Sequence, residues 1–178
     1  SNNPLQVELE FLRLDTHVSK NTPEEHLELF YKSFSEISDN FYDGMIITGA
    51  PVEMLPFEEV TYWNEIKTIF DWARKHVTST LYICWASQAA LYHFYGIEKK
   101  PLDKKLFGVF KHSAEDKLDP LFRGFDDEFY IPHSRHTTVE KEDILKNPAI
   151  KILSESDKAG ISIVSTRGGR ELYLTGHS

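Results

Sequence analysis

The chain is poor in the features that mark several common classes of protein. Its 178 residues include one cysteine, Cys84, so the printed sequence can form no intramolecular disulfide, which fits a reducing compartment. No apolar run approaches the length that spans a membrane. Residues 1–10 show neither the basic start nor the apolar stretch of a signal peptide. We therefore expect a cytoplasmic protein that binds no membrane.

Positive charge is also in short supply. The chain has 20 Lys and Arg residues against 28 Asp and Glu residues, for a net charge of -8. Binding to nucleic acid phosphates needs a basic face, so we expect no nucleic-acid partner. No GxxxxGK[ST] or GxGxxG motif is present, and neither nucleotide hydrolysis nor dinucleotide binding is supported. The 40% of hydrophobic residues and 27% of charged residues are typical of one globular domain.

The first half of the chain alternates between the apolar spacings of strands and helices. Strands leave every second residue or a short continuous run apolar, whereas helices leave every third or fourth residue apolar. Thr22, Pro23 and Glu25 also form the capping box of a helix start. The expected order is strand 5–9, helix 22–37, strand 45–48, helix 63–73, strand 80–83 and helix 87–95.

Strands that alternate with helices need crossover connections, and these favour a parallel sheet and the α/β class. The second half of the chain is richer in strands. We expect them at 106–110, 128–131, 150–153, 161–165 and 171–175, with a hairpin turn at Gly168-Gly169. The fold class is therefore α/β with a strand-rich second half.

Cys84 lies where an apolar strand runs directly into a helix. A side chain at such a junction projects above the carboxyl edge of the sheet, where α/β proteins bind ligands. The following helix start offers free N–H groups and partial positive charge, which stabilise a thiolate and an oxyanion. The position by itself leaves open whether Cys84 is a nucleophile or a buried, inert cysteine.

Five segments together decide between these interpretations. In this order, they resemble the homoserine O-acyltransferases of methionine biosynthesis, which include homoserine succinyltransferases and transacetylases. The segments are Pro4-Leu5-Gln6-Val7, residues 44–51 (GMIITGAP), Cys84-Trp85, Pro132-His133-Ser134-Arg135 and Thr175-Gly176-His177. The resemblance covers essentially the whole chain. It implies a parallel-sheet sandwich like that of class I glutamine amidotransferases, which is flavodoxin-like.

The resemblance also implies a Cys–His–Glu catalytic set. Cys84 matches its nucleophile and His177 matches its histidine, which without the resemblance would be read as a surface residue. The orienting glutamate is expected directly after Ser178. We accordingly expect residues 1–178 to be a single domain without the family's N-terminal segment and C-terminal end. The oxyanion hole is expected to combine the backbone N–H groups of Val52 and Trp85.

The segment 132–136 carries two imidazoles, a hydroxyl and a guanidinium. Its histidines are possible metal ligands, but no further cluster with ligand spacing supports them, so we expect no metal. A polar loop that binds an amino acid is the better interpretation. The fork of Arg135 suits a carboxylate, and the resemblance adds Ser134 and Lys105 as substrate contacts.

Glu53 is the expected determinant of the acyl donor. In the family, the matching position is glutamate in acetyl-transferring members and glycine in succinyl-transferring ones. We therefore expect acetyl-CoA as co-substrate, L-homoserine as acceptor, no cofactor, and a homodimer. The segment Cys-Trp-Ala-Ser-Gln-Ala-Ala departs from the family's Cys-Trp-Gly-Ala-Gln-Ala-Gly, which keeps L-serine open as the acceptor. A glutamine-hydrolysing enzyme and a non-catalytic binding module remain further alternatives.

Overall fold

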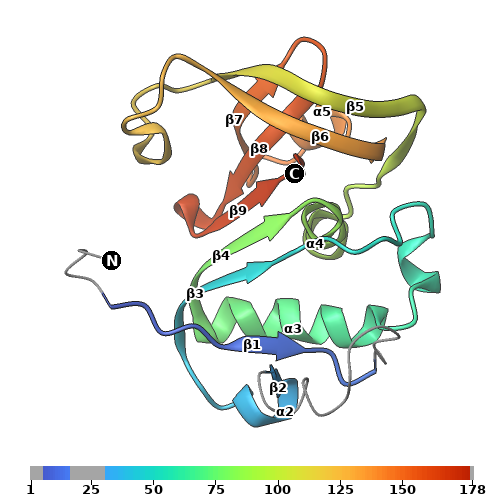
Figure 1. Ribbon diagram of the computed structural model, residues 1–178, viewed down its shortest axis with the longest axis vertical. Coiled ribbons are helices and arrows are strands. Elements are labelled where there is room, and N and C mark those ends of the chain that lie inside the picture. Colours follow the sequence, from blue (N-terminus) through green and yellow to red (C-terminus); the bar gives the residue numbers. More distant parts are fainter. Residues whose placement is uncertain (1–5, 17–30, 177–178) are drawn as a thin grey trace.

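The computed structural model describes residues 6–16 and 31–176 of the chain, and within them two sheets and several helices. Figure 1 shows the longest of these helices, α3, running beneath the strands β3 and β4. The strands are β1 (Phe11–Arg13), β2 (Tyr31–Ser33), β3 (Tyr42–Ile47), β4 (Val77–Ile83), β5 (Lys100–Ala114), β6 (Glu128–Thr138), β7 (Lys151–Ser156), β8 (Gly160–Thr166) and β9 (Glu171–Leu174). The α-helices are α2 (Phe34–Ile37), α3 (Trp63–His76), α4 (Trp85–Tyr95) and α5 (Lys141–Leu145).

The main sheet confirms the α/β class and is parallel in one half only. In the described residues it has seven strands in the order β3-β4-β9-β8-β7-β5-β6. β3, β4 and β9 pair in parallel, whereas every pairing from β9 through β8, β7 and β5 to β6 is antiparallel. The sheet curls, so that the β5–β6 hairpin lies above α4 in Figure 1. The parallel half therefore positions one group of residues and the antiparallel half another.

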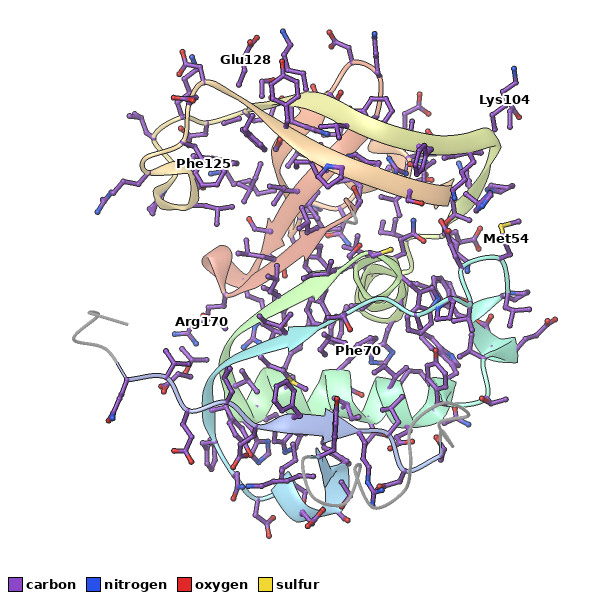
Figure 2. All side chains as sticks on the ribbon, in the orientation of Figure 1. Met54, Phe70, Lys104, Phe125, Glu128 and Arg170 are labelled. Atoms are coloured by element: carbon purple, nitrogen blue, oxygen red, sulfur yellow. The ribbon has the colours of Figure 1, made fainter. Side chains whose placement is uncertain are left out.

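Helix α3 supplies much of the core beneath the parallel strands. Its predicted apolar stripe is confirmed, because Trp63, Ile66, Phe70 and Ala73 are all buried. Phe70 lies between α3 and the strands in Figure 2, and its ring meets that of Tyr82 edge-on at 5.4 Å. These contacts fix β4 above the helix and, with it, the residue that follows the strand.

The predicted strands of the second half are confirmed. The bounds of β7, β8 and β9 differ from the predicted ones by a few residues at most, whereas β5 and β6 are much longer than predicted. Those two form a long antiparallel hairpin that pairs from Lys100 with Thr138 to Ser113 with Glu128. The predicted turn at Gly168-Gly169 joins β8 to β9, and Gly168 has the left-handed φ of 67° that favours glycine there.

The expectations for the first 37 residues are wrong for residues 6–10 and 31–33, whereas the helix expected to end at residue 37 is confirmed over Phe34–Ile37. Residues 6–10 form no strand and are exposed, with Val7 at 76% and Leu9 at 74%, and β1 begins only at Phe11. The predicted helix 22–37 lies partly outside the described residues. Its described end is strand β2 followed by α2, because Ser33 and Glu36 form the capping box that starts this helix. The helix start is therefore set by the capping box at Ser33 rather than by the apolar spacing of the longer segment.

Candidate active site

Cys84 sits at a strained junction between β4 and α4. Its backbone has φ 56° and ψ −122°, a left-handed conformation that a residue other than glycine adopts at a cost of about 1–3 kcal/mol. Surrounding hydrogen bonds hold it there. The Cys84 N–H donates to the Leu174 carbonyl at 2.8 Å, and the Cys84 carbonyl accepts from the Ser87 N–H at 3.0 Å and the Ser87 hydroxyl at 2.7 Å. The thiol is only partly buried. The predicted strand-to-helix junction, called the elbow below, is thus present.

Gly49, in the loop after β3, lies against this junction. A Cβ added at Gly49 would stand 3.0 Å from the Cys84 Cβ, 3.3 Å from its Sγ and 3.3 Å from the Trp85 nitrogen. Only a residue without a side chain leaves that space open. The loop 48–53 therefore borders the cysteine directly, as its sequence position after a buried strand predicts.

The surroundings of Cys84 raise the pKa of its thiol. Burial is the largest influence on its pKa and raises it, and the nearby negative charge of Glu53 raises it further. A hydrogen bond from the Trp85 backbone N–H and the positive charge of Arg135 act in the opposite direction but do not outweigh these effects. A reaction at this sulfur therefore needs a base to remove its proton.

The two N–H groups expected to form an oxyanion hole are in different situations. The Trp85 N–H, at the start of α4, already bonds toward the Cys84 sulfur. The Val52 N–H donates to the Ala50 carbonyl at 2.8 Å, in a three-residue turn. That bond would have to be exchanged for one to an oxyanion, so the role of Val52 remains a prediction.

Glu53 is held by the backbone of β6. One of its carboxylate oxygens, Oε1, accepts from the N–H groups of His136 and Thr137, both at 2.8 Å, and from the Thr137 hydroxyl at 2.7 Å. The structure thus brings Glu53 together with Cys84 and the end of β6. Sequence reasoning did not single out Thr137.

The three predicted substrate contacts lie on two faces of the β5–β6 hairpin. Ser134 pairs with Phe107, and Lys105 lies on that same outer face, where its ammonium is 5.4 Å from the Phe107 ring centre. Arg135 points to the inner face and is 2% exposed. Its guanidinium donates to the carbonyls of Thr137 at 2.8 Å and Ala159 at 2.5 Å. One small substrate cannot contact Ser134 and Arg135 from the same side of the strand.

A pair of buried histidines continues from Arg135. The Arg135 Nε–H donates to His133 Nδ1 at 3.3 Å, and the Nε2 atoms of His133 and His112 are 3.0 Å apart. Burial, with a smaller contribution from the charge of Arg135, lowers the pKa of each imidazole to about 4. The bond from Arg135 makes His133 Nδ1 an acceptor, so His133 Nε2 carries the proton and donates to His112. The sequence made His133 a possible metal ligand. In the structure it belongs instead to this series of hydrogen bonds from Arg135 to His112.

His177, the predicted base, lies outside the described residues. The residue before it, Gly176, is described and lies against β6. A Cβ there would meet the Ile131 side chain at 2.3 Å and the Pro132 carbonyl at 3.1 Å. In the part of the chain that the structure covers, no three His, Cys, Asp or Glu side chains are grouped to hold a metal ion. None of the described helices is both long and apolar enough to cross a membrane.

Comparison with a family model identifies the family of this chain. The model of homoserine O-succinyltransferase matches residues 1–178. The chain belongs to the homoserine O-succinyltransferase family. It is also 65% identical over 178 residues to a homoserine O-acetyltransferase of Bacteroides fragilis and 62% identical to one of Parabacteroides distasonis. A homoserine O-acetyltransferase of Brevibacillus brevis is 58% identical over 177 residues, or 99% of this chain.

The two homoserine O-acetyltransferases from Bacteroides fragilis and Parabacteroides distasonis are longer than the chain. It is matched over its full length, and it spans 58% and 57% of theirs. The family model is named for succinyl transfer, whereas these relatives are named for acetyl transfer. The names therefore agree on the acceptor and differ on the acyl group.

Solved structures of glutamine amidotransferases share the fold. One from Thermotoga maritima has a TM-score of 0.60 at 15% identity and covers 74% of this chain and 55% of its own. Another, from Methylobacillus flagellatus, has a TM-score of 0.58 at 11% identity and covers 78% of this chain and 70% of its own. These likenesses confirm the predicted amidotransferase-like architecture of the homoserine O-succinyltransferase family member described here.

Three residues around the site were missed by sequence reasoning: Gln88, His112 and Thr137. Each is nearly fully buried, at 3%, 1% and 4% exposure. Gln88, between alanines and a serine in α4, was the available signal, because a buried polar group must find a partner. His112 stands between Lys111 and Ser113, and nothing in its spacing marks it.

Proposed function

We propose that the protein transfers an acetyl group from acetyl-CoA to the side-chain hydroxyl of L-homoserine, with Cys84 as the nucleophile. The observation that carries this proposal is the strained elbow at Cys84. It turns the sulfur out at the carboxyl edge of the parallel strands, with the Trp85 N–H directed at it. Such strain persists only where surrounding structure enforces it, and it is concentrated at functional sites.

The first half-reaction forms a thioester on the enzyme. Because the surroundings raise the pKa of the Cys84 thiol, His177 removes its proton as the sulfur attacks the acetyl-CoA carbonyl. The new carbon–sulfur bond forms, the bond to the CoA sulfur breaks, and the proton passes to the departing CoA thiolate. The Trp85 N–H, with that of Val52 once it is released from Ala50, stabilises the oxyanion.

The second half-reaction returns the enzyme to its starting state. His177 takes the proton of the homoserine hydroxyl, and the oxygen attacks the acetyl group on Cys84. The carbon–sulfur bond breaks and the proton passes to the sulfur, giving O-acetylhomoserine and the free thiol. A glutamate beyond Ser178 would orient His177, as an acid residue orients the histidine of other triads.

Glu53 supports acetyl rather than succinyl as the acyl group. Its carboxylate is close enough to Cys84 to raise the pKa of the thiol. A succinyl group on that sulfur would bring a second carboxylate into the same space. Like charges at about 4 Å cost on the order of 4 kcal/mol near a protein surface. Acetyl carries no charge and meets no such cost.

Homoserine is favoured over serine by where the unusual residues of the nucleophile segment lie. Ala86 and Ala90, which carry extra methyl groups, are both 0% exposed and belong to the core. The Ser87 hydroxyl is bonded to the Cys84 carbonyl. None of the three side chains enters the space above the sulfur, so they do not shrink the acceptor site. Lys105 and Ser134 remain acceptor contacts on the family resemblance alone, since both lie on the outer face of the hairpin.

The test is steady-state kinetics on the full-length protein, with homoserine and serine as acceptors and acetyl-CoA and succinyl-CoA as donors. We expect the highest kcat/KM for the homoserine and acetyl-CoA pair, and we expect Glu53→Gly to gain succinyl-CoA activity while losing its preference for acetyl-CoA. A wild-type preference for succinyl-CoA would overturn the donor. A preference for serine would overturn the acceptor, and release of ammonia from glutamine without acyl transfer would overturn the reaction class.

A further inference from the structure

The carboxylate of Glu53 is fixed on one side only. Oε1 accepts three hydrogen bonds, all from β6, and two of them come from Thr137. No hydrogen-bond partner for Oε2 is found among residues 6–16 and 31–176. One oxygen therefore anchors the group, and the other remains available to face whatever is bound at Cys84.

We propose that Thr137 is a specificity-positioning residue, which fixes the Glu53 carboxylate at the distance from Cys84 at which it rejects a negatively charged acyl group. This proposal rests on the donor preference proposed above and extends it to a residue outside the acyl pocket. Electrostatic discrimination depends on a fixed separation, because a carboxylate free to turn into solvent is screened and loses its effect.

The Thr137 hydroxyl connects Glu53 to the helix that carries the nucleophile. It lies 2.9 Å from the side-chain oxygen of Gln88 and 2.7 Å from Glu53. A hydroxyl has one proton and cannot donate to both oxygens. Turning the Gln88 amide by 180° lets its NH₂ donate to Thr137, which then donates to Glu53. Gln88 lies in the first turn of α4, where its N–H reaches the Cys84 carbonyl at 3.4 Å.

The peptide groups on both sides of this contact are also fixed. Arg135 donates to the Thr137 carbonyl at 2.8 Å from inside the hairpin. Lys99 donates to the backbone carbonyls of Glu53 and Leu55, which ties the loop after β3 to the segment before β5. Because both backbones are held, the Thr137 hydroxyl is the side-chain part of an anchor whose other two donors are backbone N–H groups. It is 4% exposed, so water cannot readily replace it.

The test compares kcat/KM for acetyl-CoA and succinyl-CoA in variants of the full-length protein. Thr137→Val keeps the shape and the backbone N–H but removes the hydroxyl. We expect the acetyl-to-succinyl ratio to fall roughly tenfold, which corresponds to about 1.4 kcal/mol. Thr137→Ser keeps the donor and should keep the ratio. Thr138→Val is the matched control, because the Thr138 hydroxyl contacts Val139 and not Glu53.

An unchanged ratio in folded Thr137→Val would overturn the proposal. If that variant does not fold, Gln88→Met takes its place. It removes the hydrogen bond between Gln88 and the Thr137 hydroxyl and should also lower the acetyl-to-succinyl ratio. A lower ratio in Thr138→Val as large as that in Thr137→Val would likewise overturn it, because the effect would then belong to β6 as a whole.

Glu53→Gly separates this proposal from the one on which it rests. If Glu53→Gly leaves the donor ratio unchanged, the donor assignment itself is wrong. If Glu53→Gly changes the ratio and Thr137→Val does not, the positioning role alone is wrong. With both correct, Thr137→Val adds nothing to the ratio in a Glu53→Gly background, because the two residues act through one carboxylate.

Discussion

In the parallel half of the sheet the conformation of the backbone positions the reactive group, whereas in the antiparallel half hydrogen bonds position the side chains. Cys84 takes its direction from a strand end, a helix start and a left-handed φ. Glu53, Thr137 and Arg135 take theirs from hydrogen bonds that join a loop, a helix and a hairpin. Substitutions in the two halves should therefore fail in different ways. In the parallel half, crowding should lower the rate of acyl transfer. In the antiparallel half, loss of a hydrogen-bond partner should alter donor selectivity or pH dependence.

Among substitutions that leave Cys84 in place, the largest effect is expected from Gly49→Ala, which crowds the backbone next to the nucleophile. The added methyl would stand 3.0 Å from the Cys84 Cβ, so the loop or the nucleophile must shift. A displacement of about 1 Å near a reacting atom costs roughly a hundredfold in rate. We expect a loss of that order in kcat/KM, measured beside Gly44→Ala. That control places its methyl 3.9 Å from the Ser79 carbonyl, an ordinary contact. Equal activity of the two variants would mean that Gly49 does not border the reaction.

A smaller effect is expected at Arg135, where the two halves meet. Its positive charge lowers the pKa of the Cys84 thiol. Arg135→Met should therefore raise that pKa and slow both acylation and alkylation of Cys84 near neutral pH, whereas Arg135→Lys keeps the charge and should behave more like the wild type. The pH dependence of iodoacetamide modification measures this. The sequence analysis instead expects Arg135 to bind the carboxylate of the acceptor. In that case Arg135→Met would raise the KM for homoserine and leave acylation of Cys84 unaltered.

The smallest effect concerns stability alone and belongs to the histidine pair. Burial lowers the pKa of His112 and of His133 from 6.5 to about 4. Between these pH values the unfolded chain binds protons that the folded chain does not, so stability falls as the pH falls from about 6.5 to about 4. Each such imidazole contributes up to about 1.4 kcal/mol per pH unit to the slope.

The slope can be measured without relying on absolute stability. Unfolding by urea at a series of pH values should give a shallower slope for His112→Phe than for the wild type. Phe110→Leu, which disturbs the same hairpin at the ring facing His133, is the control and should lower stability without changing the slope. An identical slope in His112→Phe would show that His112 gains its proton at the same pH in the folded and unfolded chain.

The parallel half could be predicted from sequence because its signals are local. The apolar stripe of α3, the run that forms β4 and the stop at Gly96, with its left-handed φ of 67°, each depend on residues close in the chain. The order of the strands and the long curl of β5 and β6 over α4 could not be derived from such spacing. They depend on pairings such as Thr80 with Glu171, far apart in the sequence.

The candidate site divides in the same way. Cys84 was singled out by its strand-to-helix junction, but its role as nucleophile, like the role of Glu53, came from the resemblance to the homoserine O-acyltransferases. Thr137, which holds Glu53, is 84 residues from it along the chain, so no spacing rule connects them. The inward direction of Arg135 follows from the register of β6, which the sequence left undetermined because polar residues occupy both faces at 133–138.

The most direct test of the acyl-enzyme account is intact-mass spectrometry of the full-length protein after brief mixing with acetyl-CoA and no acceptor. The account predicts a mass increase of one acetyl group, located on the peptide that contains Cys84, which disappears when homoserine is added. Cys84→Ala should show no increase and no turnover. Absence of the adduct in an active wild-type enzyme, or turnover retained by folded Cys84→Ala, would contradict the account.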